Sequence, residues 1–194
     1  MRIGCVVMAA GDARRFGENK LAALFAGRPL ILRALDAVPE EEFAAVAVVT
    51  QYPEVESMAE RYGFIPVHNP HPDWGISHTI RLGLEALGEC EAAVFQVSDQ
   101  PMLRRETVKA EVEFFRQHPD KLVGLGHNGV RGNPCIFPAS YYPELLALKE
   151  DHGGSSVIRR HEENLLLCEC PAEELEDADT RQALLAIESH KKLI

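Results

Sequence analysis

A short segment between positions 11 and 20 has the residue types needed to hold a polyphosphate. Gly11 and Gly17 lack side chains, so the backbone there can approach a ligand closely and turn its N–H groups toward an anion. Arg14, Arg15 and Lys20 place three cations in the same segment. Backbone amides combined with Arg and Lys side chains are groups that bind phosphates in proteins. The segment therefore predicts a phosphate-binding loop.

The spacing of these residues excludes two common phosphate-binding motifs. Gly11 and Gly17 are six positions apart, and Lys20 follows the second glycine by three positions. A dinucleotide-binding turn requires G-x-G-x-x-G, and a P-loop requires G-x-x-x-x-G-K-[ST]. A solvated basic loop without a ligand is the alternative interpretation of the same residues.

Asp99 is a second candidate for chemistry. It comes just after the apolar run Ala92–Val97, and Pro101 follows two positions later. A carboxylate at the carboxyl end of a buried strand can hold Mg²⁺, which takes one or two carboxylates together with substrate phosphate oxygens. The same residue could instead be a turn or cap residue before the next helix. The residue types alone leave both roles open.

Apolar runs alternate with amphipathic segments along the chain, and these elements must position the candidate residues. Short apolar runs predict strands over Ile3–Met8, Ala44–Thr50, Phe64–Val67, Ala92–Val97, Leu122–Leu125 and Leu165–Cys168. Helical spacing predicts helices over Leu30–Leu35, Pro53–Tyr62, His78–Leu87, Arg104–His118, Tyr141–Lys149 and Thr180–His190. This alternation predicts an α/β fold, a three-layer α/β/α sandwich with a mostly parallel sheet. Ligands bind such sheets at the carboxyl ends of the strands, where the loop after Met8 and Asp99 both fall.

Length and composition limit the class of protein. The 194 residues fit one domain, and 46% apolar and 26% charged residues are ordinary for a globular protein. The formal charge of −10 argues against nucleic acid or an anionic membrane as the main partner. The apolar run from Ile3 to Ala10 is too short to span a bilayer. Five scattered cysteines without a CxxC pair are consistent with a reducing cytoplasm.

The first loop also carries a family resemblance. It resembles the signature of the molybdenum cofactor cytidylyltransferases and guanylyltransferases, the MobA-like NTP transferases, in the stretch Met8-Ala9-Ala10-Gly11-x-Ala13-x-Arg15-x-Gly17-x-x-Lys20. The resemblance covers nearly the whole chain and implies a Rossmann-like nucleotidyltransferase fold of the GT-A type. It also implies a nucleotide-binding part over about 1–120 and an acceptor-binding part over about 121–194. Arg15 and Lys20 would neutralise the triphosphate, and with Asp99 they form the implied catalytic set.

The resemblance implies a metal site as well. Asp99 opens an Asp-Gln-Pro turn that looks like the family's metal-binding turn, and Asp179 lies in a segment similar to the family's closing Asp-x-Asp-Thr motif. We expect both to hold Mg²⁺ or Mn²⁺, with Asp177 a weaker candidate that could instead cap a helix. Arg181 and Gln182 depart from the Pro-Glu that often follows this motif.

Two further segments resemble the family's substrate-binding regions. The nucleotide-binding residues implied are Ala9, Ala10, Gly11, Gly75, Ser77, Thr79 and Ser98, together with Arg15 and Lys20. Ala-Ala-Gly in the first loop and the Gly75…Thr79 element look like the cytidylyl branch, which implies CTP. Gly132, Asn133 and Pro134 resemble the family's Gly-His-Pro segment and imply the acceptor site. Asn133 stands where His is usual and cannot titrate near neutral pH, and Ser155 stands where Arg is frequent.

The implied reaction is transfer of CMP from CTP to the terminal phosphate of molybdopterin or the molybdenum cofactor, with release of pyrophosphate. The implied setting is the cytoplasm, and a molybdenum hydroxylase apoprotein is the implied recipient. Three alternatives stay open. The donor could be GTP, the acceptor could be another phosphate, or the chain could be a non-catalytic protein that binds the cofactor and escorts it to a hydroxylase.

Overall fold

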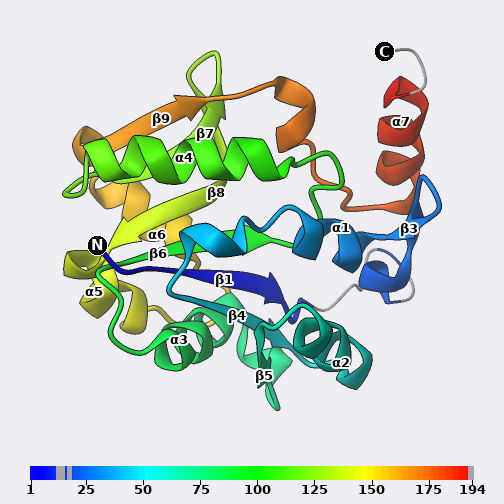
Figure 1. Cartoon of the computed structure of the whole chain (residues 1–194), viewed down its shortest axis with the longest axis horizontal. Helices are drawn as coiled ribbons and strands as arrows, with labels where there is room; N and C mark the ends of the chain where they lie inside the picture. The colour runs from blue at the N-terminus through cyan, green and yellow to red at the C-terminus, as the bar shows by residue number, and fades with distance from the viewer. Residues whose placement is uncertain (12–15, 17–18, 192–194) are drawn as a thin grey trace.

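The central sheet combines the strands that the apolar runs predict with one that they do not. The computed structural model describes residues 1–11, 16 and 19–191. Within this part of the chain a seven-stranded sheet has the order β5-β4-β1-β6-β8-β7-β9 (Figure 1). Its strands are β1 (Ile3–Ala9), β4 (Ala45–Thr50), β5 (Ile65–His68), β6 (Ala92–Val97), β7 (Leu122–His127), β8 (Val130–Pro138) and β9 (Leu165–Glu169). A separate hairpin pairs β2 (Leu24–Phe25) with β3 (Arg28–Pro29).

Strand β1 occupies the middle of the parallel part of the sheet. It is parallel to β4 on one side and to β6 on the other, with Ala9 opposite Thr50 and Met8 opposite Val97. The carboxyl ends of these strands therefore meet at one edge of the sheet. This arrangement confirms the predicted mostly parallel α/β fold and makes the loops after β1 and β6 neighbours.

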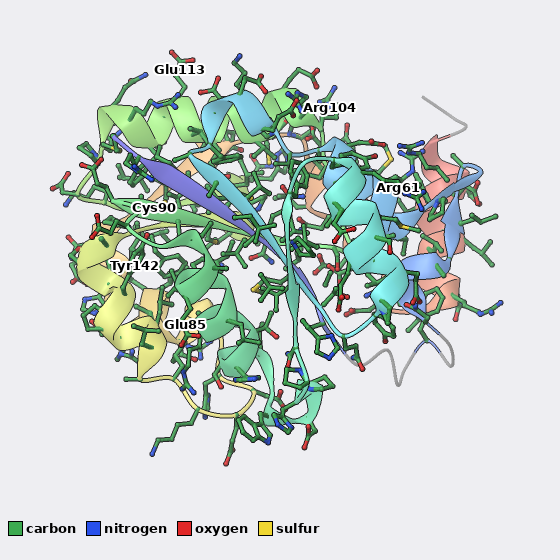
Figure 2. All side chains as sticks on the ribbon, turned by 60° about the horizontal axis from the view of Figure 1, so that its bottom comes forward. Arg61, Glu85, Cys90, Arg104, Glu113 and Tyr142 are labelled. Atoms are coloured by element: carbon green, nitrogen blue, oxygen red, sulfur yellow. The ribbon has the colours of Figure 1, made fainter. Side chains whose placement is uncertain are left out.

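Helices cover both faces of the sheet. They are α1 (Leu30–Asp36), α2 (Pro53–Arg61), α3 (Ile76–Leu87), α4 (Arg105–Gln117), α5 (Tyr142–Leu146), α6 (Gly154–Arg160) and α7 (Arg181–Lys191). Successive side chains of a strand point to opposite faces, so Cys5 packs in the cluster with α1, α2 and α4, whereas Val6 packs in the cluster with α3, α5 and α6. The polar faces of the helices point outward, as Figure 2 shows for Glu85 and Glu113.

The region after β7 differs from the expectation. The sequence predicts a strand over Leu122–Leu125 and none after it before the helix at Tyr141, but β7 continues to His127 and β8 returns antiparallel between β6 and β7. The sequence does not predict β8, because its first half contains Gly132, Asn133 and Pro134, and these residue types have low strand propensity. Since β8 runs against β6, its first residues lie toward the edge at which β6 ends.

The helical elements of the second half also differ in extent. The helix expected over 141–149 ends at Leu146, and α6 was not predicted at all. Helix α6 begins with Gly154, Ser155 and Ser156, so its first turn is made of residues with lower helix propensity than Ala or Leu. Helix α7 stands beside the β2–β3 hairpin (Figure 1), where the Ala26 N–H donates to Glu188 Oε1 at 3.0 Å. Among the described helices none is long and apolar enough to cross a membrane.

Candidate active site

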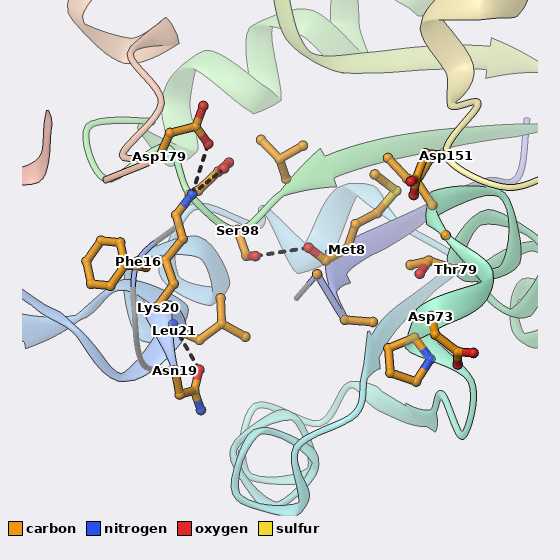
Figure 3. A pocket seen from close by; sticks show the side chains of 17 residues that line it. Met8, Phe16, Asn19, Lys20, Leu21, Asp73, Thr79, Ser98, Asp151 and Asp179 are labelled. Atoms are coloured by element: carbon orange, nitrogen blue, oxygen red, sulfur yellow. Dashed lines mark hydrogen bonds and ion pairs between the residues drawn. The ribbon is translucent and has the colours of Figure 1, made fainter. Parts of the chain in front are cut away.

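A cleft of about 660 Å³ lies at the carboxyl ends of β1 and β6 (Figure 3). Ala10 and Gly11 line it from the loop after β1, and Ser98 and Asp99 line it from the loop after β6. Ser98 Oγ donates a hydrogen bond to the Met8 carbonyl at 2.9 Å, which ties the two strand ends together. On the other side, Gln51 Nε2 donates to the Ala10 carbonyl at 3.0 Å. The start of the first loop is thereby fixed from both neighbouring strands.

One end of the cleft is charged. Lys20 Nζ lies 2.8 Å from Asp99 Oδ2 and 3.3 Å from Asp179 Oδ1 (Figure 3). Asn19 helps to place the lysine, because its side chain accepts a hydrogen bond from the Leu21 N–H and caps the short turn Lys20–Ala22. The Ala178 N–H donates to the Asp99 carbonyl at 2.8 Å, so the segment before α7 is held against the end of β6. Three distant parts of the sequence meet here.

The donor set at this end fits a divalent cation. Carboxylate oxygens are the ligands that Mg²⁺ and Mn²⁺ prefer, and Asp99 and Asp179 carry such oxygens within 3.3 Å of Lys20 Nζ. Burial, followed by the negative charges of Asp99 and Asp179, raises the pKa of Asp177 to about 6.

Lys20 Nζ lies between Asp99 and Asp179. In the described part of the chain, no three carboxyl, imidazole or thiol groups lie close enough together to hold a metal ion. Binding of a cation by Asp99 and Asp179 requires the Lys20 ammonium group to move away from them, and it stays a prediction.

The opposite end of the cleft is built where two loops touch. Gly75 has φ +84°, and a Cβ on it would lie 2.4 Å from the backbone of Glu150. The Ser77 N–H donates to the Glu150 carbonyl at 3.1 Å. This close contact holds the α5–α6 loop against the start of α3, and it brings Asp151 to the cleft on the same side as Asp73 and Thr79 (Figure 3).

Sequence comparison decides the family. Residues 5–165 match the family model of the MobA-like NTP transferase domain. The chain belongs to the MobA-like NTP transferase family. The resemblance found in the first loop is confirmed, and the chain is a nucleotidyltransferase.

Two curated relatives of this MobA-like NTP transferase are 25% identical to it. Purine catabolism protein PucB of Bacillus subtilis (strain 168) matches over 166 residues, which are 79% of this chain and 79% of that protein. The 2-C-methyl-D-erythritol 4-phosphate cytidylyltransferase of Dehalococcoides mccartyi (strain CBDB1) matches over 118 residues, which are 58% of this chain and 52% of that protein. The match thus spans about half the length of the cytidylyltransferase.

Solved structures share the fold over nearly the whole chain. A nucleotidyl transferase from Methanothermobacter is 21% identical with a TM-score of 0.81, and the match covers 97% of each chain. Rv0371c of Mycobacterium tuberculosis in complex with manganese is 17% identical, with a TM-score of 0.73 and coverage of 97% and 99%. Molybdopterin-guanine dinucleotide biosynthesis protein A of Archaeoglobus fulgidus is 16% identical, with a TM-score of 0.69 and coverage of 98% and 100%. At these identities the likeness shows the fold alone.

The predicted nucleotide-binding and metal-binding residues largely gather at the cleft. Its walls include Ala10, Gly11, Lys20, Gly75, Thr79, Ser98, Asp99 and Asp179. Ala9 is buried at the end of β1 beneath the cleft. Ser77 lines a second, smaller hollow of about 360 Å³, together with Trp74 and His78. Arg15 lies outside the described residues, as do Asp12, Arg14 and Gly17.

The predicted acceptor residues occupy a different place. Gly132, Asn133 and Pro134 lie in the first half of β8 and do not line the cleft. Gly132 packs closely against Leu175, since a Cβ there would lie 2.7 Å from that side chain. Their role in acceptor binding stays a prediction.

Sequence reasoning did not select several residues that line the cleft. Among them are Phe16, Asn19, Asp73 and Asp151. Asp151 lies four positions before Ser155 in the sequence, but the residue types give no reason to place it near Thr79. The only available signal was Gly75, whose loop could receive a second loop at close approach.

Proposed function

We propose that this chain transfers CMP from CTP to the terminal phosphate of molybdopterin or the molybdenum cofactor. The cluster of Lys20, Asp99 and Asp179 carries the proposal, because it places a cation and metal-binding carboxylates at one end of a cleft that is less charged in its middle. The family assignment supports nucleotidyl transfer. Ala10 and Thr79 support a cytidine nucleotide, because both line the cleft and both match the cytidylyl pattern.

In the proposed reaction an oxygen of the acceptor phosphate attacks the α-phosphorus of CTP. A new P–O bond forms, the bond from the α-phosphorus to the bridging oxygen breaks, and pyrophosphate leaves with the electron pair. No protein nucleophile is required, so the chain contributes alignment and charge neutralisation. Mg²⁺ or Mn²⁺ supplies Lewis-acid neutralisation of the phosphate oxygens when bound.

The chain's own residues prepare this geometry. Asp99 and Asp179 would hold the cation, and Lys20 would turn from Asp99 toward the triphosphate and stabilise the charge on pyrophosphate. Arg15, from the same loop, would add a second cation. The acceptor would approach from β8, along Gly132, Asn133 and Pro134. Asn133 can hydrogen bond there but cannot remove a proton.

Manganese in the Rv0371c structure supports a divalent metal. The Archaeoglobus protein named for molybdopterin-guanine dinucleotide biosynthesis supports a molybdopterin acceptor, and it keeps GTP as the alternative donor. Delivery of the product to a molybdenum hydroxylase in the cytoplasm is part of the same proposal.

The test combines binding with product formation. The unfolding temperature is measured with CTP, GTP, ATP and UTP, each with Mg²⁺ and with a chelator. A nucleotide at about 100 times its Kd adds about 2.7 kcal/mol to the free energy of unfolding. We expect a rise with CTP that needs the metal, and release of pyrophosphate when molybdopterin is added. A rise with GTP instead assigns the other donor, and no rise with any nucleotide contradicts the proposal.

The variant Asp99→Ala separates an enzyme from an escort protein. We expect it to lose pyrophosphate release by about 100-fold or more, because the carboxylate that holds the metal is gone. Asp120→Ala is the matched control, since Asp120 is exposed in the turn between α4 and β7, away from the cleft. If Asp99→Ala forms product at the normal rate, Asp99 does not hold a catalytic metal.

A further inference from the structure

Asn69 is a buried polar residue that none of the roles above uses. It directly follows β5 and is only 1% exposed. Its backbone N–H donates to the Thr50 carbonyl at 2.7 Å. Its side chain accepts from the His71 N–H at 2.9 Å through Oδ1 and donates from Nδ2 to Thr79 Oγ1 at 3.3 Å. A buried amide with both ends engaged has one fixed orientation.

The His71 N–H fixes the orientation of the Asn69 side-chain amide. A backbone N–H can only donate, so the amide oxygen of Asn69 must face it, and the NH₂ group must face Thr79. The Thr79 hydroxyl therefore receives a hydrogen bond from Asn69 and keeps its own proton to donate. Within the described part of the chain, that proton has no acceptor. Thr79 is 6% exposed and lines the cleft, so the proton is directed to whatever binds there.

We propose that Asn69 is a positioning residue that turns the Thr79 hydroxyl into a hydrogen-bond donor for the base of the bound nucleotide. The inference rests on the proposed function, because the phosphates then lie with Lys20 and the base lies at the opposite end, with Thr79 (Figure 3). Asp73 and Asp151 supply acceptors on that same side. A donor near carboxylate acceptors matches a base whose ring acceptor adjoins an amino group, as N3 adjoins the N4 amino group in cytosine. Uracil presents a carbonyl in place of that amino group.

The test is a double-mutant cycle on CTP affinity. Thr79→Val removes the donor with little change of shape, and we expect the Kd of CTP with Mg²⁺ to rise about tenfold, the value of one hydrogen bond. Asn69→Leu frees the hydroxyl to turn elsewhere, and we expect a rise of about threefold to tenfold. In the Thr79→Val background, Asn69→Leu is expected to weaken binding less than in the parent chain, because the group that it positions is absent and only the lost bond to the His71 N–H remains. Thr79→Ser keeps the hydroxyl, so we expect its Kd for CTP to lie close to that of the parent chain and well below that of Thr79→Val.

Asn69→Asp covers the case in which Asn69→Leu does not fold. An Asp carboxylate accepts from both the His71 N–H and the Thr79 hydroxyl, so it draws the proton away from the cleft. We expect a weaker Kd for CTP than in the parent chain. Asn164→Asp is the control for added charge, because Asn164 lies just before the edge strand β9 and bonds Lys121.

The outcomes separate the two proposals. A parent chain that binds no nucleotide overturns the proposed function and this inference with it. A parent chain that binds CTP while the two substitutions multiply their effects on Kd overturns only the positioning role. A loss confined to kcat, with Kd unchanged, also overturns it, because a base contact acts on binding.

Discussion

At the scale of single residues, ionisation of Asp177 at the charged end of the cleft lowers the stability of the folded protein. Burial and the charges of Asp99 and Asp179 raise its pKa to about 6 from an ordinary 3.8, so folding disfavours its ionised form. The folded state then binds more protons than the unfolded state between these two values, and stability falls as pH rises through that window. Asp177 is solvent-exposed in part, so the loss is on the order of 1 kcal/mol after allowance for screening.

Asp177→Asn is therefore expected to stabilise the metal-free protein at neutral pH. The gain in free energy of unfolding should be about 1 kcal/mol at pH 7 and should vanish below about pH 4, where the carboxyl is protonated in both states. Urea unfolding with a chelator at a series of pH values measures it. A gain of equal size at every pH would contradict an electrostatic origin.

At the scale of elements, the contact between Gly75 and Glu150 connects the two halves of the chain. Gly75→Ala meets the Glu150 backbone at 2.4 Å and places a side chain at φ +84°. We expect a loss of stability of at least about 2 kcal/mol and a weaker Kd for nucleotide, because Asp151 leaves the cleft with its loop. Urea unfolding and CTP titration measure the two effects.

Gly63→Ala is the matched control for that prediction. Gly63 has φ +76°, nearly the same as Gly75, but a Cβ on it has no neighbour within 4 Å. It should lose only the conformational cost of about 1 kcal/mol and bind nucleotide as the parent chain does. Equal losses in the two variants would show that the loop contact contributes nothing.

The strands and helices also show which parts of the fold the sequence could predict. The apolar runs of β1, β4 and β6 and the amphipathic period of α4 reflect burial, and each identified its element within one or two residues. Strand β8 was missed because Gly132, Asn133 and Pro134 do not show a strand pattern, although neighbours on both sides pair with it. Lys20 and Asp99 could be found because each follows a strong local signal. Asp73 and Asp151 could not, since only the tertiary contact at Gly75 brings them together.

At the scale of the whole molecule, both halves of the chain build one sheet and one cleft. The part before residue 120 supplies Lys20 and Asp99, and the part after it supplies Asp151 and Asp179. The net charge of −10 surrounds the cleft in which we propose that a nucleoside triphosphate binds. At low salt this field extends about 30 Å and repels the free nucleotide, whereas a divalent cation reduces the nucleotide's charge.

The sign of the salt effect follows from that charge. Without metal, we expect the affinity for CTP to increase several-fold as NaCl rises from about 0.01 M to about 0.1 M, because screening shortens the repulsive field to about 10 Å. With Mg²⁺ the dependence should be weaker. Isothermal titration calorimetry measures both titrations. A metal-free affinity that falls with added salt would mean that the cations of the first loop outweigh the charge of the whole molecule.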